Sequence, residues 1–126
     1  YWLGRMNTAS NTAGKRLVDD LDLHWYPEAT GGGQRITTSS GASAVAAARV
    51  QAPRSLWDPT YTENSWITND YLHGPIRLLP SVQARIDAAY PGTGLAVTEW
   101  NYGGGGHISG AVASADVLGE GGIIST

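Results

Sequence analysis

Two short apolar segments, residues 17–23 and 95–98, have the length and composition of β-strands, and they constrain the fold more than any other feature of this sequence. Helical patterns precede, separate and follow them, over residues 1–13, 42–51, 80–90 and 109–118. This alternation predicts an α/β fold with a parallel sheet and helical crossovers. Two parallel strands alone leave too many open edges to be stable. We therefore expect part of a (β/α)8 TIM barrel, which typically needs about 250 residues, rather than a small atypical fold.

The expected helices are bounded by residues that start or stop helical structure. Gly14 follows the first helix and supplies a C-terminal stop. Ser39 or Ser40 is expected to cap the Ala-rich second helix, and Pro53 to end it. Pro80 suits the first position of the third helix. Nothing caps the start of the first helix, and a domain that begins inside a helix suggests a chain cut from something longer.

Three segments lie outside these regular patterns. Residues 30–33 contain three glycines in a row and predict a flexible loop. The long segment between the second and third helices holds Trp57, Tyr61 and Trp66, and its aromatic content argues against disorder. These rings form either a sugar-stacking platform or the hydrophobic pins of a long loop, and we favour the pins slightly. Residues 120–126 carry the apolar pair of a strand that begins and then stops.

Charge and cysteine content exclude several classes of function. Eight Lys and Arg residues against eleven Asp and Glu give a net charge of −3, without a basic run. Such a chain is a poor electrostatic partner for nucleic acid or for an anionic membrane, and no apolar stretch approaches the roughly 18 residues of a membrane-spanning helix. The absence of cysteine excludes disulfides, thiol catalysis and Cys-ligated zinc.

Both expected strands end in polar and aromatic residues that are followed by a loop rich in Gly or Pro. Glu99 closes one strand, and His24, Trp25 and Tyr26 close the other. In α/β barrels the reacting residues stand at the carboxyl ends of the strands. A carboxylate held rigidly there is suited to act as a nucleophile or general acid/base. The alternative is a structural Glu99 that caps the following loop or pairs with an arginine.

Other residues near the strand ends have more than one interpretation. Asn101 and Tyr102 either orient Glu99 and bond sugar hydroxyls, or make the turn before the glycine run. His24 either donates a hydrogen bond to a substrate or carboxylate, or is a buried histidine bonded to backbone. Its spacing to His73 and His107 matches no zinc motif, so no metal site is expected. The run of four glycines at residues 103–106 lacks the lysine of a phosphate-binding loop, which argues against nucleotide binding.

Three motifs in order give the sequence a specific resemblance. They are LDLHWYPE at residues 21–28, WDPTYTENSW at 57–66 and LAVTEWNYG at 95–103. Together they resemble the later part of the catalytic domain of glycoside hydrolase family 44, and the likeness extends from Tyr1 to about Gly119. This family contains endo-β-1,4-glucanases, some of which also act on xylan or xyloglucan.

The resemblance implies a (β/α)8 barrel, an accessory β-domain in the full protein and a retaining mechanism with two glutamates. The family's nucleophile lies in a Thr-Glu-aromatic-Asn-Tyr-Gly segment, which maps onto Glu99. Its acid/base glutamate belongs to an Asn-Glu-Pro-like segment on an earlier strand, and this sequence contains none. Glu28, Glu63 and Glu120 do not match that segment, so we assign none of them the role. Retaining hydrolysis needs two carboxyl groups about 5–5.5 Å apart, so Glu99 alone supplies half of the chemistry.

We therefore expect residues 1–126 to be the carboxyl-terminal portion of a glycoside hydrolase barrel, without a second domain. In the complete enzyme Glu99 attacks the sugar of a β-1,4-glucan. The residues expected to bind substrate are His24, Trp25, Tyr26, Trp100 and Tyr102.

The expected partners are a β-glucan chain and the rest of the barrel, with no nucleic acid and no membrane. No cofactor is expected in this segment, and a structural calcium or zinc ion in the full enzyme stays open. Secretion follows from the polymeric substrate. The alternatives are a non-catalytic carbohydrate-binding or structural fragment, and a barrel enzyme of unrelated chemistry.

Overall fold

Two parallel strands form the centre of the structure, a computed structural model that describes residues 1–121. Strand β1 (Asp20–Trp25) pairs with β4 (Gly94–Trp100), in a register that runs from Asp20 opposite Gly94 to Trp25 opposite Trp100. The expected parallel pair is therefore confirmed. Its bounds differ from the prediction, because β1 begins three residues later than Leu17 and both strands extend further at their carboxyl ends.

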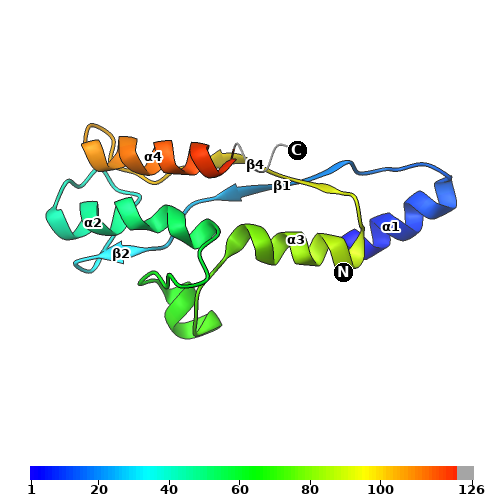
Figure 1. Cartoon of the computed structure of the whole chain (residues 1–126), viewed down its shortest axis with the longest axis horizontal. Helices are drawn as coiled ribbons and strands as arrows, with labels where there is room; N and C mark the ends of the chain where they lie inside the picture. The colour runs from blue at the N-terminus through cyan, green and yellow to red at the C-terminus, as the bar shows by residue number, and fades with distance from the viewer. Residues whose placement is uncertain (122–126) are drawn as a thin grey trace.

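The remaining elements surround this pair (Figure 1). They are α1 (Trp2–Ala13), β2 (Thr30–Gly31), β3 (Gln34–Arg35), α2 (Ser43–Gln51), the 3-10 helix η1 (Ala52–Leu56), the π-helix η2 (Ile67–Leu72), α3 (Leu78–Ala89) and α4 (Ile108–Gly121). The four predicted α-helices are all present. The predicted strand in residues 120–126 falls largely on residues 122–126, which lie outside the described part of the chain.

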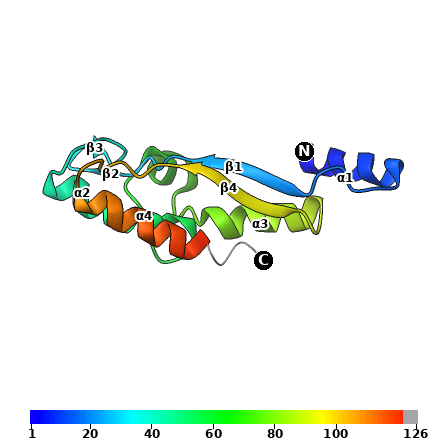
Figure 2. The same ribbon diagram turned by 90° about the horizontal axis from the view of Figure 1, so that it is seen from above.

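Helices cover one face of the sheet and leave the other open. Figure 2 shows α2, α3 and α4 together on one side of β1 and β4. Along β1 the side chains of Leu21, Leu23 and Trp25 are partly buried, whereas their neighbours Asp22 and His24 are exposed. Because successive residues of a strand point to opposite faces, the partly buried set faces the helices and the exposed set lies on the open face.

The core lies between the sheet and these helices. Its buried members come from residues 29–36, α2, η1, α4 and the segment after β4: Ala29, Ile36, Val45, Ala52, Leu56, Tyr102, Ala113 and Val117. Trp25 and Trp100 pack against this cluster from the sheet. Fully burying one side chain the size of Leu or Ile stabilises a fold by about 1.5–3 kcal/mol, so this cluster holds the helices on the sheet.

The glycine segment 30–33 is a β-hairpin, not the flexible loop that we predicted. β2 and β3 pair antiparallel, with Thr30 opposite Arg35 and Gly31 opposite Gln34. Gly32 and Gly33, between them, have φ angles of 58° and 76°. A two-residue hairpin turn with positive φ at both central positions matches the twist of the flanking strands, and glycine adopts it without strain.

Two details of the helix ends also differ from the predictions. No side chain caps α2, because the Ser40 hydroxyl accepts a hydrogen bond from Ala42 N–H instead (3.3 Å). The predicted end of α2 before Pro53 is confirmed, since α2 stops at Gln51 and the chain continues as the 3-10 helix η1, where proline occupies an initial position that needs no N–H donor. Helix α3 begins at Leu78, so Pro80 lies within its first turn and not at its start. The predicted stop at Gly14 is confirmed by its left-handed conformation (φ 65°).

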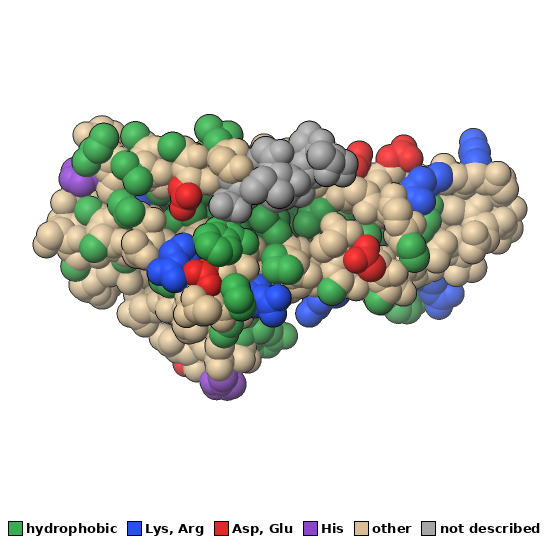
Figure 3. Space-filling view, in the orientation of Figure 1, with side chains coloured by type: hydrophobic (Ala, Val, Ile, Leu, Met, Phe, Trp, Pro, Cys, Tyr) green, Lys and Arg blue, Asp and Glu red, His purple; other side chains and the backbone are tan. Residues whose placement is uncertain are grey.

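Charges are dispersed over the described surface. Figure 3 shows basic and acidic side chains scattered over the face in view, without a continuous basic patch there. Within residues 1–121, no helix has the length and apolar character that crossing a bilayer would require.

Candidate active site

Glu99 lies on the open face of the sheet because β4 contains a bulge. The register passes from Leu23 opposite Val97 to His24 opposite Glu99, so Thr98 is an extra residue in β4. Thr98 and Glu99 are both exposed, and Trp100 is again partly buried. A bulge breaks the strict alternation of side chains, which allows two consecutive residues to point away from the helices.

The bulge is held by Asp22 on the neighbouring strand. The Thr98 hydroxyl lies 2.8 Å from each carboxylate oxygen of Asp22, and the Thr98 N–H donates to Asp22 Oδ1 (3.2 Å). A carboxylate makes stronger hydrogen bonds than a neutral acceptor. Asp22 therefore fixes the backbone immediately before Glu99.

Two side chains from the end of β1 reach the Glu99 carboxylate. The Tyr26 hydroxyl donates a hydrogen bond to Oε1. Nδ1 of His24 lies 3.8 Å from Oε2, and the two side chains are each about half exposed, at 55% and 54%. The hydrogen bond to Glu99 raises the pKa of Tyr26, with smaller contributions in the same direction from burial and from the charge of Glu99. Tyr26 is therefore protonated at neutral pH and acts as a donor.

The other three predicted substrate-binding residues lie elsewhere. Trp25 and Trp100 pack against the core on the helical side of the sheet. Tyr102 is 1% exposed, with its ring centroid 6.2 Å from that of Trp100 in an edge-on arrangement. The structure thus brings His24 and Tyr26 to Glu99, and it places these three aromatics behind the site.

Asn101 makes the turn before the glycine run, which was one of the two roles that the sequence left open for it. Its Oδ1 accepts a hydrogen bond from the N–H of Gly103 at 2.7 Å, which mimics a backbone turn. Gly103 has a φ of 72°, and a Cβ built there would come within 2.4 Å of the Ile36 carbonyl oxygen. The glycine run therefore begins where the chain must pass against residues 36–37.

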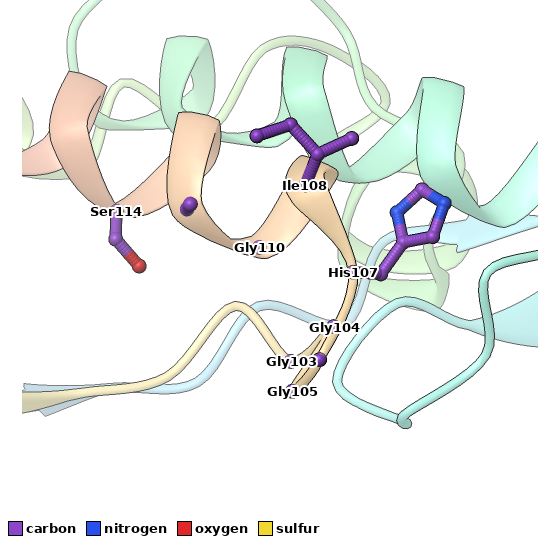
Figure 4. A pocket seen from close by; sticks show the side chains of 9 residues that line it. Gly103, Gly104, Gly105, His107, Ile108, Gly110 and Ser114 are labelled. Carbon is purple, nitrogen blue, oxygen red and sulfur yellow. The ribbon is translucent and has the colours of Figure 1, made fainter.

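The glycine run and the start of α4 line a shallow pocket of about 510 Å³ (Figure 4). Its lining residues are Gly103, Gly104, Gly105, Gly106, His107, Ile108, Gly110, Ala111 and Ser114. None of these lining residues is a lysine or arginine. His107 Nδ1 lies 2.8 Å from the Ser109 hydroxyl, which places this histidine at the start of α4. Among residues 1–121, no group of three or more potential metal ligands gathers.

Arg49 is a buried residue that the sequence analysis missed. It is 0% exposed, and its guanidinium donates to the carbonyl oxygens of Ile36 and Tyr102 (both 3.0 Å from Nε) and to the Ser109 hydroxyl (2.7 Å). It thereby joins the hairpin, the segment after β4 and α4. The sequence feature that could have predicted this burial is the position of Arg49 four residues after Val45, which places both on the same buried side of α2.

The aromatic residues of the long segment have separate surroundings. Tyr61 is partly buried beneath Arg54, whose guanidinium carbon lies 4.8 Å from the ring centroid. Trp57 and Trp66 are 42% and 57% exposed. Trp66 precedes η2, and the backbone of Asn64 accepts a hydrogen bond from Thr30 N–H in the hairpin (2.8 Å). Tyr61 is thus a pin of this segment, whereas the rings of Trp57 and Trp66 stay exposed.

A carboxylate at the carboxyl end of parallel strands stands where α/β-barrel enzymes place their reacting groups, and glycoside hydrolases use carboxylates for their chemistry. The comparisons agree with this class. The sequence profile described as "Glycoside hydrolase family 44" matches residues 1–29. Endoglucanase A of Paenibacillus lautus is 54% identical over 120 residues, which are 94% of this chain and 17% of that protein.

Solved structures extend the match to the fold. A family 44 endoglucanase produced by Clostridium acetobutylium superposes with a TM-score of 0.90 at 56% identity, covering 98% of this chain and 24% of that one. A Paenibacillus polymyxa xyloglucanase of the same family, solved with xyloglucan, gives 0.89 at 50% identity, covering 95% and 23%. The resemblance to glycoside hydrolase family 44 is thus confirmed: nearly the whole chain matches a segment of this family's enzymes. It spans about a sixth of the curated relative and about a quarter of each solved chain.

Proposed function

We propose that the chain is the carboxyl-terminal portion of a (β/α)8 catalytic barrel that hydrolyses internal β-1,4 linkages of glucans. The observation that carries the proposal is the Glu99 carboxylate, fixed by Tyr26 and facing His24 on the open face of a parallel strand pair. In a complete barrel that face would line the interior, and its carboxyl end, where Glu99 lies, would open onto the sugar groove. The names of the relatives, endoglucanase and xyloglucanase, support a β-glucan substrate.

In the proposed mechanism Glu99 is the nucleophile of a retaining double displacement. One of its oxygens attacks the anomeric carbon while a second carboxyl group, outside this chain, protonates the leaving glycosidic oxygen. The resulting glycosyl ester on Glu99 is then hydrolysed by water, which that second group deprotonates. The Tyr26 hydroxyl holds the attacking carboxylate in place, and His24 is positioned to bond either Glu99 or a sugar hydroxyl.

The roles of the aromatic residues follow from where they lie. We propose direct substrate contact for His24 and Tyr26, and a supporting role behind the strands for Trp25, Trp100 and Tyr102. A polymeric substrate too large to enter a cell implies that the enzyme is secreted. The relative named xyloglucanase makes xyloglucan a candidate beside unbranched glucan, and initial rates of the complete enzyme on carboxymethyl-cellulose, xyloglucan and xylan would rank them.

Substitution of Glu99 in the complete enzyme tests the proposal. Glu99→Gln keeps the shape of the side chain but removes its nucleophilic charge, and kcat on a β-glucan should fall by at least about 1,000-fold. Glu99→Gly with added azide should regain turnover and release an α-glycosyl azide, because azide attacks from the face that Glu99 occupied. The matched control is Glu28→Gln, since Glu28 pairs with Arg35 at 2.5 Å and not with the site. Turnover of Glu99→Gln near the wild-type rate would exclude the nucleophile role.

A further inference from the structure

Asp22 is an acidic residue of the open face to which the proposed mechanism gives no task. It lies two positions before His24 on β1, so both side chains project from the same face of the sheet as Glu99. The ion pairs formed within residues 1–121 do not include Asp22. Its carboxylate bonds instead to Thr98, which immediately precedes Glu99 on β4. The charge of Asp22 is therefore used on the strand that carries the proposed nucleophile.

These bonds differ from the ones that regular pairing of the two strands would produce. Asp22 is opposite Ala96 in the register, so its carboxylate reaches along the sheet toward the carboxyl end of β4 to meet Thr98. The Thr98 N–H donates to Oδ1 at 3.2 Å, and the hydroxyl lies 2.8 Å from each oxygen. The extra residue of a bulge is left unpaired in the ladder, and its N–H needs another acceptor. Asp22 supplies that acceptor from the neighbouring strand.

The bulge decides where the Glu99 carboxylate points. Thr98 and Glu99 are both exposed, whereas regular alternation would turn one of them toward the helices. In the observed arrangement Tyr26 and His24 contact the Glu99 carboxylate from β1. Hydrogen bonds to a carboxylate are about twice as strong as those between neutral groups, so Asp22 is suited to keep the bulge in one conformation.

We propose that Asp22 is a positioning residue for the nucleophile, which acts through Thr98 on the backbone from which Glu99 projects. Tyr26 orients the carboxylate at its outer end, whereas Asp22 fixes the main chain at its base. The inference rests on the proposed function, because it assigns Asp22 to the same site. Displacement of a reacting group by about 1 Å can lower the rate by about 100-fold, so a loosened bulge slows the attack on the anomeric carbon.

Two other roles for Asp22 predict different kinetics. A purely structural aspartate changes how much enzyme is folded, but it does not change the rate of each folded molecule. An aspartate that served as the acid/base group would be needed to protonate the leaving oxygen of a glucan, but not for a leaving group that departs without a proton. A positioning aspartate affects the attack by Glu99 whatever the leaving group is.

Steady-state kinetics of the complete enzyme on a soluble β-glucan provide the first part of the test. Asp22→Ala should lower kcat about 10- to 100-fold, with KM within about twofold of wild type. Thr98→Val keeps the shape and the N–H but removes the hydroxyl, and kcat should fall about 3- to 10-fold. The double variant should be no slower than Asp22→Ala, which already lacks every bond between the two side chains.

Two further variants serve as controls for these losses. Thr98→Ser keeps both donors to Asp22, and its kcat should stay within about twofold of wild type. Asp20→Ala removes another exposed aspartate from the same face of β1, opposite Gly94 at the far end of the pair, and should also stay within about twofold. If Thr98→Ser is as slow as Thr98→Val, or Asp20→Ala as slow as Asp22→Ala, the bonds between Asp22 and Thr98 are not responsible and the inference is wrong.

Trapping of the glycosyl-enzyme with 2,4-dinitrophenyl 2-deoxy-2-fluoro-β-cellobioside provides the second part. Glu99 attacks the anomeric carbon, and dinitrophenolate leaves with the bonding electron pair and without a proton, so the group outside this chain is not needed. The amount of dinitrophenolate released counts the competent sites, and its rate measures the attack. In Asp22→Ala the amount should stay near one per folded enzyme, and the rate should fall by the same factor as kcat. A normal rate with fewer sites would show a structural role, and a normal rate despite slow glucan hydrolysis would show an acid/base role; either overturns the inference.

The two proposals fail separately. Trapping of the probe by Glu99→Gln at the wild-type rate would overturn the proposed function and, with it, the role of Asp22. An unreactive Glu99→Gln enzyme combined with a wild-type trapping rate in Asp22→Ala would overturn only the role of Asp22.

Discussion

The hydroxyl of Tyr26 donates a hydrogen bond to Oε1 of Glu99, a residue 73 positions further along the chain. The two residues meet because β1 and β4 are parallel neighbours, whose carboxyl ends lie at the same edge of the sheet. A neutral hydroxyl that donates a hydrogen bond to a carboxylate fixes the orientation of that carboxylate. This pair, with His24 beside it, is the arrangement on which the proposed nucleophile depends.

Removing the Tyr26 hydroxyl should slow the chemical step. In Tyr26→Phe the Glu99 carboxylate loses its fixed orientation, and kcat of the complete enzyme should fall about 10- to 100-fold with a smaller change in KM. Steady-state kinetics on a soluble β-glucan measure both constants. Tyr71→Phe is the control, because Tyr71 is 75% exposed on η2. An equal loss in both variants would show that the Tyr26 contact with Glu99 is not responsible.

Trp66 should contribute to substrate binding. It is 57% exposed in the segment that bonds to the hairpin after β1, so its ring can stack on a sugar. Trp66→Ala should weaken oligosaccharide binding about 5- to 100-fold, which corresponds to about 1–3 kcal/mol. Isothermal titration calorimetry with the inactive Glu99→Gln enzyme measures the effect. Trp2, 53% exposed on α1, is the matched control, because α1 lies apart from the segment between α2 and α3 that carries Trp66 (Figure 1). Equal affinities of Trp66→Ala and Trp2→Ala would refute a stacking role for Trp66.

Arg49 should be essential for stability and not for catalysis. In Arg49→Met the carbonyl oxygens of Ile36 and Tyr102 and the Ser109 hydroxyl lose a buried donor. The free energy of unfolding should fall by about 3 kcal/mol or more, since each unsatisfied buried group costs about 1–3 kcal/mol. Denaturant unfolding measures this loss. The exposed Arg85 provides the control variant, Arg85→Met, which should stay within about 0.5 kcal/mol of wild type. A similar small loss for Arg49→Met would mean that water replaces the guanidinium.

The stability of the enzyme should depend on pH through Glu63. Burial raises the pKa of Glu63 above its ordinary value of 4.5, against the effect of the Ser55 and Ser65 hydroxyls. The folded state therefore binds this proton more tightly than the unfolded state does, and stability falls as the pH rises above about 4.5. Glu63→Gln cannot ionise and lacks this loss, so its Tm relative to wild type should rise with pH. A difference in Tm that stays constant from pH 4.5 to 8 would contradict the burial of an ionisable Glu63.

Local patterns were sufficient to predict the frame of the molecule. The parallel pair, the four helices and the meeting of His24 and Tyr26 with Glu99 follow from apolar runs and from the direction of the strands. The hairpin was not predictable in this way, because its strands are two residues long and show no periodicity. The positions of Trp25 and Trp100, on the helical side of the sheet, were not predictable. They depend on which face of each strand meets the helices, and the sequence of two strands does not reveal this.

The residues that were missed depend on partners far away in the chain. Arg49 is satisfied by carbonyl groups that lie 13 and 53 residues away. Glu63 is 2% exposed, although it lies between η1 and η2 in a segment without regular periodicity. An arginine in an Ala-rich helix and a glutamate in a loop both have compositions typical of solvent-exposed positions. Their burial is a property of the assembled fold, which local patterns do not contain.

The orientation of Glu99 depends on a bulge that accommodates the extra residue of β4. In a strand that kept Thr98 but alternated regularly, the side chain at position 99 would turn from the open face toward the core. A graft that copied these residues onto a regular strand would therefore bury the carboxylate while keeping every functional side chain in the sequence. A design that transfers this site to another barrel must therefore include the bulge in β4 together with Asp22, which bonds it.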